Sequence, residues 1–401
     1  MRYTENDIGK EMERLIHDNE MSGAALIVRK HNEVVYKGKW GNADIEDRKP
    51  VEYNTIYWLA SMSKPITAVA IMQLIEQGKL KLEDPISKYL DGYANQKVCA
   101  KMIGLDGAYK PDPNYPAGMG IPELLESMDY VPAKRQVTIR DLLSHSSGMG
   151  MGPVGVGFTE RQLDTKDKLK DRVKKWADMP LDFQPGTATG YSAIVGFDIL
   201  GRIVEVISAM DFQSHLRKYI WEPLGIKDIT FTLSEEQQSR RAVLYTTENG
   251  QQHPLQGADS LIKTVDAMSS GYFSGAAGMR GSVEEYDKFT SMLCNGGSWN
   301  GAEILRPETV KQMQQRGSVK RLSPMPYAYW GLGMMVFTCP KKLNMGVTRG
   351  TYGWSGAFGT HMFIDPTRKL CATFVMNRSN IGGAGSPIAR LVENLVFEIY
   401  K

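Results

Sequence analysis

The motif Ser61-Met62-Ser63-Lys64 begins a stretch in which apolar residues recur at helical spacing, and it is the segment most informative about the fold. Residues three positions apart lie on one face of a helix, so Ser61 and Lys64 would present a hydroxyl and an amine side by side. A serine nucleophile needs this arrangement when its base is an amine and not an imidazole. The S-x-x-K pattern is common by chance, so its meaning depends on its surroundings.

Apolar residues recur at helical spacing after this motif and predict a helix that ends near Gly78. They are Ile66, Val69, Ala70, Leu74 and Ile75. Pro65 falls in the first turn, where its missing N–H removes no intrahelical bond. Ser61 would then stand at the positive end of the helix, which stabilises a negative charge that develops nearby.

The composition is that of an ordinary globular protein, with 42% hydrophobic and 23% charged residues among 401. This length favours two interlocked subdomains. The net charge of +3 is too small to indicate binding to nucleic acid or to an anionic membrane. No stretch approaches the roughly 18 apolar residues that span a bilayer, and the first 20 residues have no apolar signal core.

The cysteines show neither C-x-x-C pairing nor zinc-type spacing with histidine. They are Cys99, Cys294, Cys339 and Cys371. We therefore expect free thiols in a reducing cytoplasm, and neither a metal nor another cofactor. The expected partner is a small-molecule substrate, and the oligomeric state is left open.

Strand patterns lie near both ends of the chain. Two short apolar runs, Ala24 to Val28 and Val34 to Tyr36, flank His31-Asn32 and predict a hairpin after a helix within the first 20 residues. Four late strands precede a C-terminal helix from Ile388 to Tyr400. These strands are Gly331 to Thr338, Met345 to Arg349, Gly359 to Ile364 and Lys369 to Met376.

The middle of the chain is mostly helical in pattern. A capping box predicts a short helix at Thr138-Ile139-Arg140-Asp141, and longer helices are expected at Lys166 to Ala177 and Ile194 to Ile207. Residues 91–136 and 148–157 are expected to be loops. Residues 1–80 and 315–401 would thus form a discontinuous α/β sheet subdomain, and residues 81–314 a mostly helical subdomain with loop elaborations.

Two further segments carry candidate chemistry. Tyr191-Ser192-Ala193 comes just before a helix, where a phenol could relay a proton between the nucleophile and a leaving group. The segment Gly353-Trp354-Ser355-Gly356-Ala357-Phe358-Gly359 opens a late strand, and its glycines permit a ligand to approach the backbone. An N–H on this strand could face that of Ser61 across a carbonyl oxygen and form an oxyanion hole.

Together these elements resemble the class C β-lactamase-like serine hydrolases, whose superfamily also includes D,D-peptidases, family VIII carboxylesterases and some acyltransferases. The likeness extends over nearly the whole chain, because other stretches are similar to marker segments of the family. They are residues 82–90 (LEDPISKYL), 138–148 (TIRDLLSHSSG), 295–297 (NGG) and 305–310 (LRPETV). The resemblance implies a penicillin-binding-protein-like α/β fold, with an antiparallel sheet flanked by helices and an inserted mostly helical subdomain.

The resemblance also implies roles for individual residues. Ser61 would be the acylated nucleophile, and Lys64 and Tyr191 would share the general base and acid work. The backbone N–H groups of Ser61 and Ala357 would form the oxyanion hole. The residues expected to bind substrate are Trp354, Ser355, Gly356 and Ser192.

Two departures from the family pattern bear on the substrate. Ala193 stands where β-lactamases and peptidases have asparagine, and Trp354 where they have lysine or histidine. The W-x-G version is similar to the esterase members, so we expect a carboxylesterase-like hydrolase that cleaves an ester or amide through an acyl-enzyme. The alternatives are an acyltransferase, a D,D-peptidase, a β-lactamase or a D-amino-acid amidase, and a sensor module that is acylated without turnover.

Two histidines are weighed beside this motif set. His145 is expected to be structural, because Lys64 already fills the base role. His361 could be a triad base five residues after Gly356, but strand alternation leaves open which face it occupies.

Overall fold

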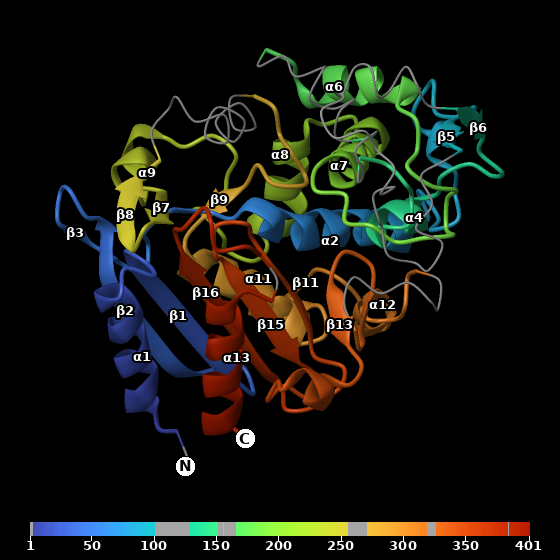
Figure 1. The fold of residues 1–401 in the computed structure, drawn as a ribbon. Helices are drawn as coiled ribbons and strands as arrows, with labels where there is room; N and C mark the ends of the chain where they lie inside the picture. Colours follow the sequence, from blue (N-terminus) through green and yellow to red (C-terminus); the bar gives the residue numbers. More distant parts are fainter. Residues whose placement is uncertain are drawn as a thin grey trace.

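The computed structural model describes residues 3–100, 129–150, 155, 166–255, 271–318, 326–383 and 385–401 (Figure 1). Its α-helices are α1 (Glu5–His17), α2 (Ser63–Glu76), α4 (Ile139–Leu143), α6 (Leu169–Lys175), α7 (Val195–Ser208), α8 (Phe212–Leu216), α9 (Glu235–Ser239), α11 (Val283–Cys294), α12 (Pro307–Met313) and α13 (Pro387–Ile399). Short 3₁₀ helices are η1 (Ala60–Met62), η2 (Ile86–Lys88), η3 (Trp176–Asp178) and η5 (Pro340–Leu343), and η4 (Arg217–Trp221) is a π-helical turn.

The strands of the large sheet are β1 (Gly23–Lys30), β2 (Glu33–Asp44), β3 (Lys49–Pro50), β12 (Ala328–Trp330), β13 (Met335–Phe337), β14 (Tyr352–Ser355), β15 (His361–Asp365) and β16 (Leu370–Met376). Smaller two-stranded pairs are formed by β4 (Tyr57–Trp58) with β9 (Arg280–Gly281), β5 (Lys97–Cys99) with β6 (Tyr130–Pro132), β7 (Tyr245–Glu248) with β8 (Gln251–Pro254), and β10 (Ser298–Trp299) with β11 (Ala302–Glu303).

Within the described residues, eight strands form one antiparallel sheet in the order β12-β13-β14-β15-β16-β1-β2-β3. The two ends of the chain meet in it, because β1 lies between β2 and β16, with Ala24 opposite Met376. The β1–β2 hairpin turns at His31 and Asn32, which both have positive φ. The fold class predicted from the sequence, an antiparallel sheet flanked by helices, is confirmed.

Alternating side chains of the sheet enter two separate cores. Leu26 and Val28 of β1 pack in the cluster that contains α1 and α13, whereas Ala25 and Ile27 pack with Val283 of α11. Figure 1 shows α1 and α13 side by side across one face of the sheet. The sheet is therefore enclosed between helices on both faces.

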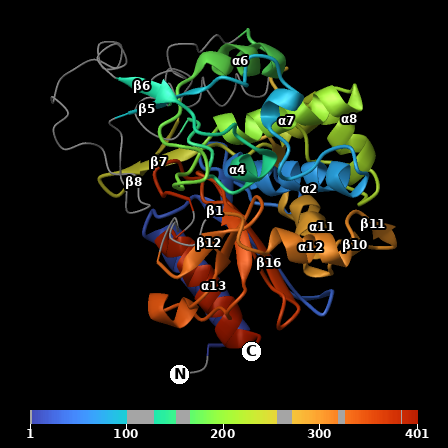
Figure 2. The ribbon, with the colours of Figure 1, turned by 90° about the vertical axis from the view of Figure 1, so that its right-hand side faces the viewer.

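Helix α2 lies at the junction between the sheet and the helices α6, α7 and α8 drawn above it, with α4 beside it at the same level (Figures 1 and 2). Every residue of α2 from Ser63 to Leu74 is buried, so the helix is enclosed on all sides and has no solvent-facing stripe. Gly78, just after its end, has φ of +69° and fits the predicted stop. This placement carries Ser61 and Lys64 into the middle of the molecule.

Two expectations for the late strands were wrong in detail. Residues 345–349 are not a strand; Met345 and Val347 are buried in the α1–α13 core, and Gly346 N–H bonds to Asn394 Oδ1 of α13 at 2.8 Å. In the predicted strand 331–338 only Met335–Phe337 is extended, and β12 precedes it. The subdomain boundaries near residues 80 and 315 stay a prediction.

Among the helices that the structure describes, none has the length and apolar character needed to cross a bilayer. Residues 101–128 of the first expected loop, and residues 151–154 and 156–157 of the second, lie outside the described part of the chain.

Candidate active site

Ser61 lies in a sharp turn that leads from β4 into α2. Ala60, just before it, has φ of +46°, a left-handed conformation that costs an L-residue about 1–2 kcal/mol. Ser61 itself lies in the short helix η1, and α2 begins at Ser63. Tyr286 OH donates to Met62 O at 2.7 Å, and Met279 N–H donates to Ser63 Oγ at 3.1 Å. These bonds fix the turn that presents the Ser61 hydroxyl.

Lys64 is completely buried in the first turn of α2. Its Nζ lies 3.2 Å from Ser61 Oγ, 2.6 Å from the Ala193 carbonyl oxygen and 3.0 Å from the Ala276 carbonyl oxygen. A carbonyl oxygen accepts only, so these two carbonyls engage two N–H bonds of the amine. When Lys64 is neutral, its lone pair is left to face Ser61.

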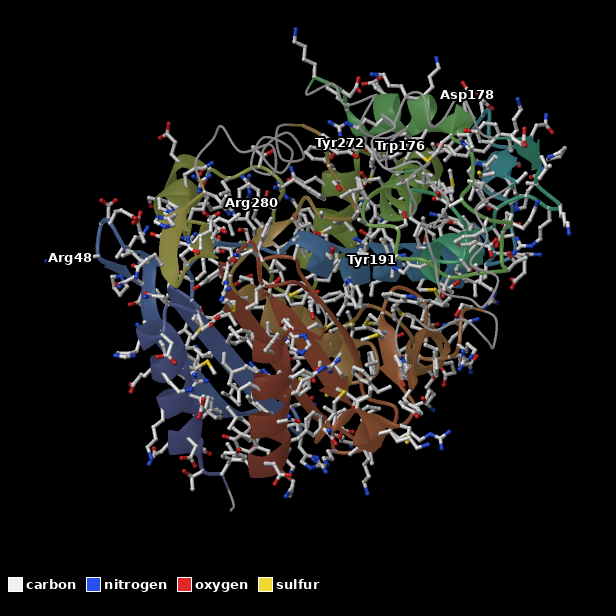
Figure 3. The ribbon with its side chains drawn as sticks, viewed as in Figure 1. Arg48, Trp176, Asp178, Tyr191, Tyr272 and Arg280 are labelled. Carbon is white, nitrogen blue, oxygen red and sulfur yellow. The ribbon has the colours of Figure 1, made fainter. Side chains whose placement is uncertain are left out.

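Tyr191 approaches the same serine from the segment before α7. Its phenol oxygen lies 2.7 Å from Ser61 Oγ, and Trp354 Nε1–H donates to that phenol oxygen at 3.3 Å. The rings of Tyr191 and Trp354 have centroids 5.2 Å apart. In Figure 3, Tyr191 is labelled close to α2, at the boundary between the sheet and the helical region.

His145 forms hydrogen bonds with the residues immediately before and after Tyr191. Its carbonyl accepts from Gly190 N–H at 3.0 Å, and its Nδ1 accepts from Ser192 N–H at 3.1 Å. The ring packs on Tyr191 with centroids 4.8 Å apart. Burial, helped by the charge of Lys64, holds the pKa of His145 well below its ordinary value of 6.5. His145 is therefore a neutral histidine that fixes the phenol, in agreement with its expected structural role.

The end of β14 lies against the turn that carries Ser61. Thr360 Oγ1 donates to the Leu59 carbonyl oxygen at 3.2 Å, and Gly356 N–H donates to the Thr360 carbonyl oxygen at 2.7 Å. A Cβ on Gly356 would overlap both Thr360 Oγ1 and Leu59 O, so only glycine fits here. Ala357 follows and is exposed between buried neighbours. This geometry suits the proposed oxyanion hole of Ser61 N–H and Ala357 N–H.

Two predicted substrate-binding residues direct their hydroxyls elsewhere. Ser355 Oγ lies 2.7 Å from His361 Nδ1, and His361 Nε2 lies 3.1 Å from Glu393 Oε1 of α13. Because neighbouring residues of a strand point to opposite faces, Ser355 faces α13 while Trp354 faces Tyr191. Ser192 Oγ accepts from Gly196 N–H at 2.9 Å at the start of α7. His361 thus contacts Ser355 and not Ser61.

Several groups of this site leave no recognisable pattern in the sequence. The carbonyls of Ala193 and Ala276 bind Lys64 through the backbone, which leaves no mark in residue identity. Trp330 stacks on the Tyr191 ring at 5.9 Å, one tryptophan among 7. The sequence also allows Met149, Met151 and Phe158 to line an apolar acyl pocket; Met149 is buried, and Met151 and Phe158 lie outside the described residues. No cluster of three or more metal-ligating side chains is found in the part of the chain that the structure describes.

A buried lysine and a tyrosine converging on one serine, at the start of a central helix beside an antiparallel sheet, define a serine hydrolase of the penicillin-binding-protein type. The family model described as Beta-lactamase matches residues 8–395, and the chain belongs to this family.

Comparison with known proteins agrees with this assignment. The chain is 28% identical over 375 residues to Protein Rv1367c of Mycobacterium tuberculosis, covering 89% of this chain and 86% of that protein. It is 25% identical over 410 residues to Esterase EstB of Burkholderia gladioli, covering 96% and 93%. The solved structure of EstCE1, described as a hydrolase with promiscuous acyltransferase activity, matches with a TM-score of 0.78 at 22% identity, covering 98% and 97%.

Proposed function

We propose that this chain is a carboxylesterase-like hydrolase that cleaves esters of small acyl groups through an acyl-enzyme on Ser61. The observation that carries the proposal is the position of Ser61 Oγ, 2.7 Å from the Tyr191 phenol and 3.2 Å from Lys64 Nζ. Both partners lie within reach for proton transfer. This arrangement supports Ser61 as the nucleophile, Lys64 as its base and Tyr191 as the acid.

In the acylation step, the ester carbonyl oxygen would occupy the hole between Ser61 N–H and Ala357 N–H. Ser61 Oγ attacks the carbonyl carbon, and the hydroxyl proton passes to neutral Lys64. As the ester C–O bond breaks, Tyr191 gives its phenol proton to the leaving alcohol oxygen. This leaves the acyl group on Ser61, an ammonium at Lys64 and a phenolate at Tyr191.

Deacylation runs in the opposite direction with water in place of the alcohol. Water attacks the acyl carbon and gives a proton to the Tyr191 phenolate. When the acyl–Oγ bond breaks, Lys64 returns its proton to Ser61, and the resting enzyme is restored. An alcohol or amine that replaced this water would make the chain an acyltransferase, which is the nearest alternative.

The preference for esters over β-lactams and D-amino amides rests on two side chains. Ala193 has no side-chain amide to bind a substrate amide, and its carbonyl is engaged by Lys64. The N–H of Trp354 is engaged by Tyr191, so neither residue offers a free partner to a substrate carboxylate. A buried carboxylate without a partner costs several kcal/mol, or orders of magnitude in catalytic efficiency. The similarity to an esterase supports the same assignment.

The test is a substrate panel of p-nitrophenyl acetate and butyrate, nitrocefin and D-amino-acid amides. We expect kcat/KM for the short esters to exceed that for nitrocefin by at least about 100-fold, roughly 2.7 kcal/mol in transition-state stabilisation. The Ser61→Ala protein is the control for spontaneous hydrolysis. Comparable values for ester and nitrocefin would overturn the esterase assignment in favour of a β-lactamase or peptidase. An acyl adduct that persists in the mass spectrum would instead indicate a sensor.

We also propose that the enzyme works in the cytoplasm. The support is chemical: all four cysteines are free thiols, as proteins of a reducing compartment usually have.

A further inference from the structure

Asp198 is a fully buried carboxylate in the first turn of α7, and the catalytic steps above do not use it. Its Oδ1 accepts from Ser274 Oγ at 2.7 Å and from Ala276 N–H at 3.0 Å. Its Oδ2 accepts from the Tyr272 phenol. A buried charge is tolerated when hydrogen bonds satisfy it in this way.

The segment that Asp198 holds is the one that binds Lys64. Ala276 donates its N–H to Asp198, and its carbonyl accepts from Lys64 Nζ at 3.0 Å. Ser274 Oγ also accepts from Ala277 N–H at 3.2 Å, which closes the turn around residue 276. The backbone of Ala276 therefore links the Asp198 carboxylate to the Lys64 amine through its N–H and its carbonyl.

Other polar groups surround this pair from each neighbouring element. Arg172 of α6 lies over the Tyr272 ring, 4.3 Å from its centroid, and the His145 ring packs on Tyr191 with centroids 4.8 Å apart. Figure 3 labels Tyr272 in the helical region below α6. Burial raises the pKa of Asp198, while its three hydrogen bonds and the charge of Lys64 act in the opposite direction. Burial likewise raises the pKa of Tyr272, so the phenol stays neutral and donates.

We propose that Asp198 is a positioning residue of the active site, which keeps the Ala276 carbonyl on Lys64 and supplies the counter-charge of that lysine. The inference rests on the proposed role of Lys64 as general base. Without the carboxylate, the amine would lose its proton at lower pH and the carbonyl that orients it would move.

The variant Asp198→Asn removes the negative charge of the side chain and keeps its size and shape. The amide keeps an oxygen that accepts from Ser274 and Ala276, and its NH₂ can donate to the Tyr272 oxygen, since a phenol also accepts. The matched control is Asp287→Asn on α11, another buried carboxylate, which pairs with Arg29 at 2.7 Å. Ser274→Ala removes a single donor of the carboxylate and also weakens the turn around residue 276.

The primary measurement is the titration of Lys64 by NMR in protein with ¹³C-labelled lysine, its Cε signal assigned by its loss in Lys64→Arg. In Asp198→Asn we expect the titration midpoint to move to lower pH, because an opposite charge nearby favours the protonated amine. The acid limb of kcat/KM against pH should move in the same direction. Asp287→Asn should leave both unchanged, and Ser274→Ala should lower kcat and move the midpoint by a smaller amount in the same direction.

An unchanged midpoint in Asp198→Asn would overturn the proposal and make Asp198 a purely structural residue. If Asp198→Asn does not fold, Tyr272→Phe removes one donor of the carboxylate and should give a smaller shift of the same sign; no shift would equally overturn it. The titration midpoint of Lys64 can be measured without enzymatic turnover. Absence of esterase activity in the wild-type protein would therefore refute the proposed function, while the midpoint would still test the role of Asp198.

Discussion

The Trp354 indole N–H points at the phenol oxygen of Tyr191, 3.3 Å away, and thereby sets the direction of a proton. An indole N–H only donates, so the Tyr191 oxygen accepts at that side and its own hydrogen is directed to Ser61 Oγ, 2.7 Å away. The Ser61 hydroxyl hydrogen is then left to point toward Lys64. A residue that substitutes for a charged group in the family pattern thus orders the hydrogen bonds for nucleophilic attack.

Ser61→Ala should abolish ester turnover and labelling by a fluorophosphonate, because it removes the nucleophile. Lys64→Ala should lose a comparable factor, and the double variant no more, since base and nucleophile act as a unit. Turnover and labelling followed by intact mass would check both. Activity in Ser61→Ala above about one per cent of wild type would contradict the assignment, because loss of a nucleophile usually costs several orders of magnitude.

Tyr191→Phe keeps the ring that packs on His145 and deletes the phenol. The protein should fold normally while kcat falls by about 10²–10⁴-fold, the usual contribution of general acid–base catalysis. Thermal unfolding together with p-nitrophenyl butyrate kinetics separates the two effects. Near-normal turnover would reassign Tyr191 to packing and leave Lys64 as the proton carrier.

Trp354→Phe tests the ordering of hydrogen bonds described above. It retains an aromatic wall and removes the N–H, so the expected loss in kcat is about tenfold, the equivalent of one neutral hydrogen bond. In a Tyr191→Phe background, Trp354→Phe should cause little further loss in kcat, because the phenol oxygen that accepts from the indole N–H is already absent. Independent, multiplicative losses in a double-mutant cycle would argue against the coupling.

Gly356→Ala should displace the end of β14 from the Ser61 turn. The added methyl would overlap the Leu59 carbonyl, which is backbone and cannot rotate away. We expect kcat to fall by at least about tenfold, because the Ala357 N–H would leave the oxyanion position. Gly9→Ala on α1, where the new Cβ meets its nearest atom at 3.6 Å, is the control and should keep full activity.

His145→Phe should remove a pH dependence of stability. The pKa of His145 is well below 6.5 in the folded protein, so the unfolded chain binds a proton below that pH and the folded chain does not. Wild-type stability therefore falls with decreasing pH through this group. At neutral pH the variant should lose about 1–3 kcal/mol, because the Ser192 N–H is left without its acceptor.

Denaturant unfolding of the two proteins from pH 7 to pH 5 measures this. Their difference in unfolding free energy should shrink as the pH falls below 6.5, with a slope of at most roughly 1.4 kcal/mol per pH unit. A constant difference would mean that His145 titrates alike in the folded and unfolded protein, and a growing difference that the folded protein holds it protonated.

Side-chain chemistry at fixed spacing made part of the site predictable. Ser61 and Lys64 had to share a helical face, and Tyr191 stood at a loop-to-helix junction, so their meeting followed from local geometry and the resemblance. The carbonyls of Ala193 and Ala276 could not be predicted, because every residue carries one. Asp198 did leave a signal, as the single charge within the apolar run 195–200.

The strand predictions failed where alternating side chains are buried but the backbone is not paired with another strand. Residues 345–349 alternate like a strand, yet Met345 and Val347 are buried by packing against a helix and not by a sheet ladder. Periodicity reports which side chains are inside and does not report what covers them. His361 had the same ambiguity, which was resolved when pairing with Ser355 placed it on the α13 face.

The position of β1 between β2 and β16 has a consequence for how the chain is made. A strand from the beginning of the chain has to wait for a neighbour from its end, since Ala24 pairs with Met376. During synthesis the β1–β2 hairpin therefore emerges from the ribosome with one edge open, and the sheet closes only after the last strand has been released. A product terminated before β16 would keep that edge unpaired, and it would be prone to join the same edge of another copy.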